Sequence, residues 1–434
     1  MPISPHYGPD GSAAIPRARV TVREIAVIGA GVAGLAVASL LARAGNRVRL
    51  LERFSTPRPL GAGLLLQPTG LAALDRLGLR ETAVALGAPI HRLDGQSFAG
   101  RAVFDVRYGN LTPGLFGLGV HRAMLHRILW DHFAASGAVL ETGAEVVDLK
   151  PSAGGGACPV GSDGRVHARA DLVIDASGAG SALRALLGGK PARPYEYGAM
   201  WCVVPDAGFA SDTLAQRYDG TRIMLGHLPV GRVDAAGAPL AAVFWSLRRA
   251  EMADWPSGFA AWRAEASRRW LDIAPALASL PGPEVFSPAL YAQFTARRPW
   301  RDGLVLVGDA AHATSPQMGQ GANQGLVDAV VLADALAATA DTAAALAQYA
   351  AVRRSHVRFY QMASIAMTPL FQSRSRLLGW MRDAVFPLLP YVPWLRREMV
   401  RALAGLKTGV LSTDEAAAIV DAARDLSREE RAGR

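Results

Sequence analysis

The sequence contains little lysine, and arginine carries almost all of its positive charge. Arginine and lysine together number 46 against 37 acidic residues, a formal net charge of +9, and only Lys150, Lys190 and Lys407 are lysines. The arginines are scattered along the chain, whereas a nucleic-acid-binding protein concentrates them on one stripe with interleaved aromatic side chains. The composition therefore predicts no nucleic-acid partner, although such a field favours anionic cofactors.

Cysteine is scarce, and the sequence shows neither a long apolar run nor the pattern of a signal peptide. Cys158 and Cys202 are too few for a disulfide framework or a zinc site, so no metal is expected. No apolar run reaches the roughly 18 residues of a transmembrane helix. Residues 1–20 contain prolines and lack the apolar centre of a signal peptide, so we expect a flexible N-terminal arm on a cytoplasmic protein.

The sequence does contain a glycine-rich turn between a short strand and a helix. A short strand over residues 22–28, apolar at its end, leads into Gly29-Ala30-Gly31-Val32-Ala33-Gly34, and a helix closed by Gly45 follows. In such a unit the first glycine permits a tight turn, the second lets a pyrophosphate approach, and the third allows close helix–strand packing. A bare pattern of this kind arises by chance about 0.4 times in so glycine-rich a chain. Its context, with Glu52 ending the next strand where a ribose hydroxyl would lie, favours dinucleotide binding.

A second glycine-rich segment follows a buried strand near position 305. The strand over residues 303–307 leads to Gly308, Asp309 and His312, and a helix is expected from about 320 to 338. The Asp309 carboxylate can accept hydrogen bonds from a polyol chain. The helix N-terminus, with its partial positive charge, suits the negative charge on one edge of a reduced flavin. A plain glycine-rich turn does not explain so many coordinated features.

These segments together resemble the FAD-dependent aromatic hydroxylases, the group A flavoprotein monooxygenases with the p-hydroxybenzoate hydroxylase fold. The similarity spans residues 24–365 and rests on positions 29–34, 52–53, 61–64, 122 and 308–323. It implies that Glu52 holds the adenosine ribose, that Arg122 contacts the flavin and that Asp309 binds the ribityl chain. The full set of expected FAD contacts is Gly29, Gly31, Ala33, Gly34, Glu52, Arg53, Ala62, Gly63, Arg122, Asp309, Pro316, Gly319, Gly321, Ala322 and Asn323.

The resemblance implies an α/β fold with a Rossmann-like FAD-binding domain of the GR2 type, a mostly β substrate domain and a helical C-terminal region. We expect the FAD-binding domain over residues 21–75, 101–190 and 296–365, and the substrate domain over 76–100 and 191–295. Short apolar runs from 195 to 295 suggest strands there, with one helix near 257–270. The C-terminal region, residues 366–434, should be helical and broken at prolines, beginning with Pro369.

The implied activity is an NAD(P)H- and O2-dependent hydroxylation, through a flavin hydroperoxide, of a hydrophobic small molecule that is aromatic, polycyclic or enol-like. The cofactor carries the hard chemistry, so no catalytic side chain is predicted. One motif departs from the family: Ser177 stands at a usual aspartate position and Asp175 at a common glycine position. This departure leaves open the electron donor, and with it a flavin-dependent dehydrogenase or reductase, a halogenase, or a non-catalytic FAD-binding protein.

Several polar residues have two interpretations. His312 either orients a group near the flavin or, as we favour, is a hydrogen-bonded residue behind it. Four side chains of the substrate domain are proton-relay candidates, although a wall residue with a satisfied polar tip is favoured for each: Tyr195, Tyr197, His227 and Tyr291. The aromatic and arginine-rich segment 374–397 fits weak contact with a membrane surface, packing over the substrate domain, or a dimer contact. A monomer and a homodimer both remain open.

Overall fold

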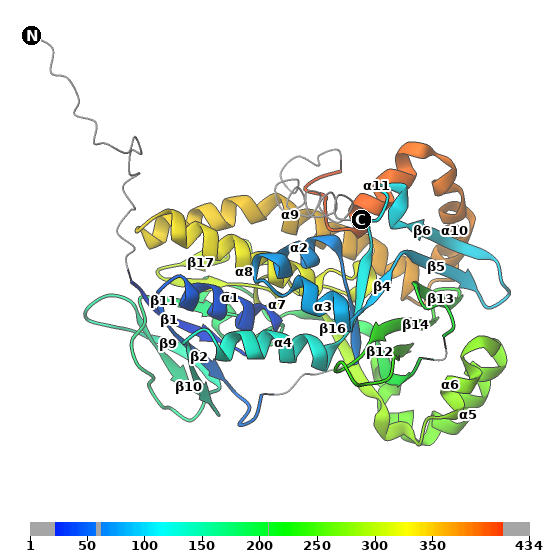
Figure 1. Cartoon of the computed structure of the whole chain (residues 1–434), viewed down its shortest axis with the longest axis horizontal. Coiled ribbons are helices and arrows are strands. Elements are labelled where there is room, and N and C mark those ends of the chain that lie inside the picture. Colours follow the sequence, from blue (N-terminus) through cyan, green and yellow to red (C-terminus); the bar gives the residue numbers. More distant parts are fainter. Residues whose placement is uncertain (1–21, 58–61, 207, 411–434) are drawn as a thin grey trace, which may run out of the picture.

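A six-stranded sheet forms the first half of the molecule (Figure 1). The computed structural model describes residues 22–57, 62–206 and 208–410. All neighbouring strands of the sheet are parallel except the edge pair β17–β18. Its strands, in spatial order, are β17 (Trp300–Arg301), β18 (Leu304–Leu306), β11 (Leu172–Asp175), β1 (Glu24–Ile28), β2 (Arg47–Glu52) and β8 (Val139–Thr142). The central strands are apolar except for Glu24 at the start of β1 and Asp175 at the end of β11, so they can be buried on both faces, as a parallel sheet requires.

Helices α1 (Val32–Arg43), α4 (Arg122–Ala134) and α8 (Gly321–Ala338) lie on this sheet, and their apolar faces build its main core. Helix α1 packs against both other helices. Helices α2 (Pro68–Arg76) and α3 (Arg80–Leu86) follow β3 (Gly63–Leu66), which forms a small antiparallel sheet with β7 (Gly117–His121) and β4 (Ala88–Ile90). The strand, turn, helix and strand expected at the N-terminus are confirmed, as is the helix after position 320.

A seven-stranded sheet forms the second half. Its strands, in spatial order, are β16 (Ser287–Gln293), β12 (Arg193–Pro205), β15 (Leu240–Arg248), β14 (Ile223–Gly231), β13 (Thr213–Asp219), β5 (Arg92–Ser97) and β6 (Ala102–Arg107). Helices α5 (Trp255–Arg269) and α6 (Ala274–Ala278) cover one face, where Trp245 packs against tryptophans of the α5 region. The expected division at position 101 falls inside this sheet, because β5 and β6 pair as a hairpin across it. Residues 102–107 therefore belong with the β-rich half in the fold.

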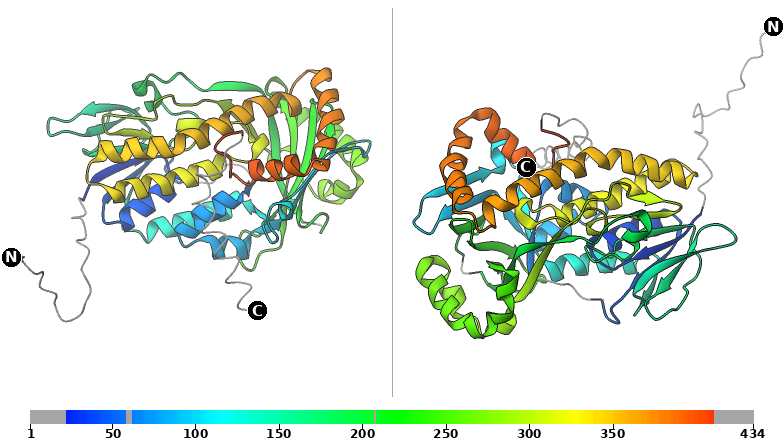
Figure 2. Two further views of the ribbon diagram at one scale, coloured as in Figure 1. Left: turned by 90° about the horizontal axis from the view of Figure 1, so that it is seen from above. Right: turned by 180° about the vertical axis from the view of Figure 1, so that it is seen from behind.

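The last helices of the described part of the chain join the two halves. Helix α9 (Thr342–Phe371), about 45 Å long for its 30 residues, runs from the first sheet to the second and leads to α10 (Arg376–Val385) and α11 (Pro393–Leu403) (Figures 1 and 2). The expected break at Pro369 is wrong: this proline lies inside the last turn of α9, which continues to Phe371. Among the residues that the structure describes, no helix is both long and apolar enough to cross a membrane.

The remaining elements are short. A hairpin of β9 (Val146–Pro151) and β10 (Ala157–Gly161) projects beside the first sheet, and α7 (Asp309–His312) follows β18. The 3-10 helices are η1 (Tyr108–Asn110), η2 (Leu183–Leu187), η3 (Arg249–Asp254), η4 (Leu271–Ile273), η5 (Pro283–Val285), η6 (Pro316–Met318) and η7 (Phe386–Tyr391). The mixed α/β fold class expected from the sequence is confirmed.

Candidate functional site

The two glycine-rich segments, far apart in the sequence, meet where α1 crosses α8. Ala33 on α1 lies against Gly308 and Gly325. A Cβ on Gly308 would come 3.2 Å from the Ala33 Cβ, and one on Gly325 would come 3.1 Å from it. Side chains at these positions would force the helices apart, so the small residues set the close approach. The crossing places the N-terminus of α1 beside the turn that carries Asp309.

Glycine occurs at each of the three positions of the N-terminal turn for a different structural reason. Gly29 has a φ of +98°, which residues with a side chain rarely adopt. A Cβ on Gly34 would lie 1.9 Å from the Gly29 carbonyl oxygen, so only glycine allows α1 to pack this closely on the turn. A Cβ on Gly31 would meet no atom within 4 Å. The open space is therefore at Gly31, the N-cap of α1, and the first N–H groups of this helix receive no side-chain cap.

Glu52 is tied to this turn by its carboxylate. One oxygen accepts the Ala30 N–H at 2.7 Å and the other accepts the Phe54 N–H at 3.0 Å. Each oxygen retains a lone pair for a further donor. The neighbouring Arg53 is exposed, with its guanidinium over the Phe54 ring at 4.7 Å.

His126 on α4 lies near Ala30 and Glu52, and it was not identified from the sequence as a site residue. Burial lowers the pKa of His126, against smaller opposing effects of the Ala30 backbone and the Glu52 charge. Arg122 and His126 are four residues apart, so they share one face of α4. That spacing was the signal that could have identified His126.

Arg122 and Asp309 lie near each other, and their environment indicates a recess in the surface. Both side chains are exposed to solvent, yet desolvation by the surrounding protein raises the pKa of the Asp309 carboxyl and lowers that of the Arg122 guanidinium. Exposure combined with desolvation indicates a position at the bottom of a concave surface. The backbone N–H of Arg122 donates to the Ala62 carbonyl at 3.0 Å, so the start of β3 is adjacent. A Cβ on Gly63 would come 2.6 Å from Val230, which shows that the second sheet closes in from this side.

A buried polar network behind Asp309 fixes its turn. Gly308 has φ 57° and ψ −141°, a conformation for glycine, and its N–H donates to Asp328 Oδ2 at 2.7 Å. His312 Nε2 contacts the same oxygen at 2.6 Å, and Arg353 Nε donates to Asp328 Oδ1 at 2.7 Å. The interpretation of His312 as a hydrogen-bonded residue behind the site is confirmed. Asp328 was missed, because an acid within a largely apolar helix does not reveal its partners.

The segment from Pro316 to Asn323 forms η6 and the first turn of α8. Gly319 adopts a left-handed conformation with φ 60°. The first N–H groups of α8, those of Gly321, Ala322 and Asn323, have no acceptor within the helix. The Asn323 side chain points elsewhere: its oxygen accepts the Gln67 N–H at 2.8 Å and its amide donates to the Gly319 carbonyl at 2.7 Å. Backbone groups, not the Asn323 side chain, are therefore available to a ligand.

The unusual residues of the middle segment stabilise each other. The buried Asp175 carboxylate accepts the Ser177 N–H at 2.9 Å, the Ser177 hydroxyl at 2.6 Å and the Ser181 hydroxyl at 2.5 Å. Arg184 lies over the Phe294 ring at 4.0 Å and donates to the Asp309 and Ala310 carbonyls. This segment thus supports the Asp309 turn, and Ser177 faces its own strand end.

An aromatic group on the second sheet adjoins Arg122. Burial raises the pKa of Tyr291 to about 12, and the nearby Arg122 charge acts against this shift. Trp201 Nε1 donates to the Tyr291 hydroxyl at 3.4 Å, and the Trp201 ring stacks on Phe244 with centroids 4.3 Å apart. We call Trp201, Phe244 and Tyr291 the aromatic wall.

The other relay candidates differ in their partners. The hydroxyl of Tyr195 donates to Gln293 at 2.6 Å and that of Tyr197 to the Ser373 carbonyl at 3.2 Å, so both tips are satisfied. His227 is buried beside the Phe209 ring, and its Nδ1 has no hydrogen-bond partner among the described residues. Burial lowers the pKa of His227, so neutral imidazole is favoured there.

Comparison with known proteins identifies the family. A model of the FAD binding domain family matches residues 22–363, so the chain belongs to this family. It is 30% identical over 401 residues to kynurenine 3-monooxygenase of Salinispora arenicola, covering 83% of this chain and 82% of that protein. It is 28% identical over 383 residues to aurachin C monooxygenase/isomerase of Stigmatella aurantiaca, covering 84% and 94%.

A solved structure has the same architecture. The complex of Klebsiella pneumoniae HpxO with FAD and uric acid superimposes with a TM-score of 0.74 at 25% identity, covering 90% of this chain and 98% of that one. With the family match, these relatives identify the chain as an FAD-dependent monooxygenase. The recognised family and the oxygenase class are confirmed, and the dehydrogenase, halogenase and non-catalytic alternatives are not favoured.

Proposed function

We propose that this monooxygenase hydroxylates a hydrophobic aromatic or enol-like small molecule between the recess of Asp309 and the aromatic wall, with NAD(P)H as the electron donor. One observation carries the proposal: the Arg122 charge acts on both Asp309 and Tyr291, and the Tyr291 hydroxyl accepts a hydrogen bond from Trp201. The recess and the aromatic wall are therefore contiguous. Similar proteins include a kynurenine 3-monooxygenase and an FAD-dependent urate hydroxylase, named for substrates that contain flat rings, which supports a flat substrate here.

The residues of the recess fit FAD. Open space and free N–H groups at Gly31 suit the pyrophosphate, and the remaining lone pairs of Glu52 suit the ribose hydroxyls. The accessible Asp309 carboxylate suits the ribityl hydroxyls, and the first N–H groups of α8 suit the electronegative edge of the flavin ring. When bound, FAD supplies the electron transfer and the oxygen activation.

The protein groups contribute charge and orientation. Arg122 is held by its backbone against Ala62 and places a cation beside Asp309 and Tyr291. Because the pKa of Tyr291 is raised to about 12, its phenol stays protonated at neutral pH and can donate to a substrate oxygen. The stacked Trp201 and Phe244 rings offer an apolar face to a flat molecule and exclude water.

A direct test begins with anaerobic mixing of the FAD-loaded protein with NADH or NADPH, followed by admission of isotopic O2 with candidate phenols and polycyclic precursors. We expect loss of flavin absorbance and one labelled oxygen atom in the product. Reduction without label in any product would contradict a monooxygenase reaction of this chain. Tyr291→Phe should raise KM or uncouple NAD(P)H oxidation from product formation. Its matched control, Tyr195→Phe, removes a hydroxyl bonded to Gln293 and should leave coupling unchanged.

A further inference from the structure

Helix α10 presents a cation to the protein and apolar side chains to solvent. Arg382 is buried, and its guanidinium lies over the rings of Tyr218 and Phe371 at 4.7 and 5.2 Å. Gly379 is on the buried side as well, against the backbone of Gly220. An ordinary surface helix turns its apolar stripe toward the core. Helix α10 does the reverse.

The outward side chains continue from α10 through η7 to the start of α11. Leu377, Met381 and Val385 follow each other at a spacing of four, so they line one face of α10. Monomeric proteins expose single apolar side chains at scattered places, whereas a contiguous group marks an interaction surface. We call this group the C-terminal apolar face. Its exposed members are Leu377, Trp380, Met381, Val385, Leu388, Tyr391, Val392 and Trp394.

The C-terminal apolar face is bordered by positive charge. Two exposed arginines precede it and two follow it: Arg374, Arg376, Arg396 and Arg397. The one acid between positions 374 and 397 is Asp383, which pairs with the buried Arg382 at 2.6 Å. The border therefore has no free negative charge to oppose an anionic partner.

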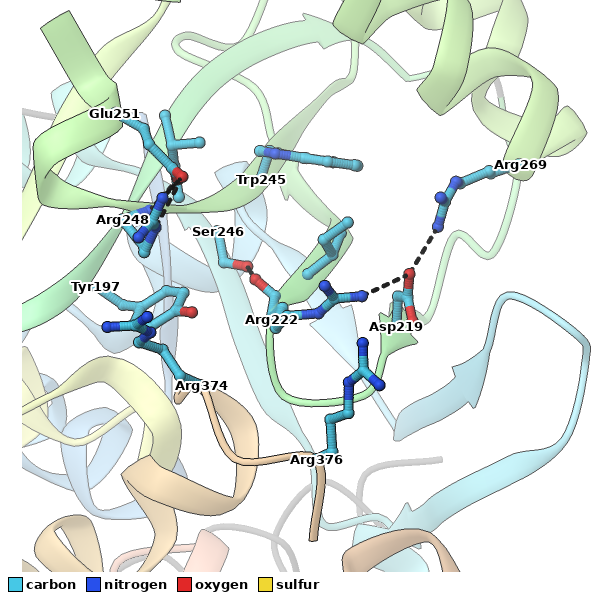
Figure 3. Close-up of a pocket in the computed structure, with 12 residues that line it drawn as sticks. Tyr197, Asp219, Arg222, Trp245, Ser246, Arg248, Glu251, Arg269, Arg374 and Arg376 are labelled. Atoms are coloured by element: carbon cyan, nitrogen blue, oxygen red, sulfur yellow. Dashed lines mark hydrogen bonds and ion pairs between the residues drawn. The ribbon is translucent and has the colours of Figure 1, made fainter. Parts of the chain in front are cut away.

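A pocket of about 620 Å³ lies beside the N-terminus of α10 (Figure 3). Its charged lining consists of five arginines and two acids: Arg222, Arg248, Arg269, Arg374, Arg376, Asp219 and Glu251. Asp219 lies 3.2 Å from Arg269 and 3.9 Å from Arg222, and Glu251 pairs with Arg248. Arg374 and Arg376 have no hydrogen bond or ion pair to another side chain within the described part of the chain. These two cations are available to a ligand.

We propose that the C-terminal apolar face docks on the surface of a bilayer containing anionic phospholipids, whose headgroup phosphates bind Arg374 and Arg376 at the pocket. Arg376 and Trp380 are one turn apart on α10, so the phosphate contact and the apolar contact fall on the same side. Tryptophan and tyrosine prefer the headgroup level, and Trp380, Tyr391 and Trp394 occupy the face. A helix of this kind lies in the interface and does not span the bilayer.

Sedimentation with vesicles tests the docking. The full-length protein, loaded with FAD, is mixed with vesicles of phosphatidylcholine alone or of phosphatidylcholine with phosphatidylglycerol. We expect binding to the anionic vesicles, weakened by salt. Arg374→Gln with Arg376→Gln should weaken it about fivefold for each arginine removed. Trp380→Ser with Leu388→Ser should weaken it about tenfold or more through loss of apolar burial.

Matched controls are Arg101→Gln, an exposed arginine elsewhere, and Leu271→Ser, an apolar side chain 76% exposed on η4. Both should bind as the wild type does. Equal FAD content and melting temperature show that each variant is folded. Absence of binding to anionic vesicles at low salt, or binding that the four substitutions leave unchanged, would overturn the proposal. A second result would also overturn the proposal: light scattering shows a dimer, the Trp380 and Leu388 substitutions dissociate it, and the protein does not bind vesicles. A second copy of the chain would then cover the face.

Discussion

Asp328 Oδ2 accepts the backbone N–H of Gly308 at 2.7 Å, which links the middle of α8 to the turn that presents Asp309. Coupling to His312, Arg353 and this N–H holds the pKa of Asp328 well below its usual range, although burial acts in the opposite direction. Asp328 is thus a charged anchor of the turn that presents Asp309. It is fully buried and acts on Asp309 through this turn, so its effect on function is a positioning effect.

Asp328→Asn should destabilise the fold by about 3–5 kcal/mol, because the buried Arg353 guanidinium loses its carboxylate. It should also lower FAD content, since the Gly308 turn loses its acceptor. Chemical denaturation and the flavin-to-protein absorbance ratio measure the two effects. Asp334→Asn is the control on the same helix: this exposed acid pairs with Arg76, and its loss should cost under about 1 kcal/mol. Equal stability of the two variants would contradict the anchoring role.

His356 predicts a specific dependence of stability on pH. Burial, assisted by the Arg353 charge, lowers the pKa of His356 from 6.5 to about 3. Between these values the unfolded chain binds a proton that the folded chain does not, so stability falls as the pH drops from 6.5 toward 3. The contribution is about 1.4 kcal/mol for each pH unit. His356→Gln, which keeps a donor for the Gly405 carbonyl, should flatten this part of the profile. An unchanged slope in urea titrations from pH 6.5 to 4.5 would exclude His356 as the cause.

Much of the recess could be predicted from the sequence because its strands and glycines carry strong local signals. The apolar strand before Gly308 and the spacing of the N-terminal glycines depend on neighbours in the sequence. The roles of Asp328 and Asn323 depend on partners distant in the chain, which local patterns do not specify. Asn323 was expected to contact FAD, yet its side-chain oxygen accepts the backbone N–H of Gln67. The sequence also does not reveal which face of α10 packs against the protein, because a helical pattern alone does not specify the buried face.

Alanine substitutions at Gly31 and Gly34 should impair different properties, FAD binding in the first case and stability of the apoprotein in the second. Gly31 has an extended conformation and open space for a Cβ, so Gly31→Ala should fold normally but bind FAD weakly, because the methyl group enters the space assigned to the pyrophosphate. Gly34→Ala would place its Cβ 1.9 Å from the Gly29 oxygen and should lower the melting temperature of the apoprotein itself. Melting curves with and without FAD separate the two. Normal FAD affinity in Gly31→Ala would mean that the pyrophosphate lies elsewhere.

Ser177 is expected to be structural. Ser177→Ala removes one hydroxyl bond to Asp175 and should cost about 1 kcal/mol, with unchanged rates of flavin reduction by NADH and NADPH. Ser177→Asp would set a second carboxylate against the buried Asp175 and should lower both the melting temperature and FAD content. Stopped-flow reduction measures the rates. If Ser177→Asp were as stable as the wild type and reduced faster by either nicotinamide, the position would belong to the nicotinamide site instead.

Asp309→Asn should change the apoprotein and the FAD complex in opposite directions. Desolvation raises the pKa of Asp309, so the folded chain holds this charge at a cost at neutral pH, and a neutral amide should leave the apoprotein as stable or more stable. The amide is a weaker acceptor than a carboxylate, so the FAD complex should lose about 1.5–3 kcal/mol of binding, more than tenfold in Kd. Fluorescence titration of apoprotein with FAD and melting of the apoprotein give both quantities. Asp302→Asn, an exposed acid before the same strand, is the control and should change neither. A less stable Asp309→Asn apoprotein with unchanged FAD affinity would assign the carboxylate to the fold and remove it from the cofactor site.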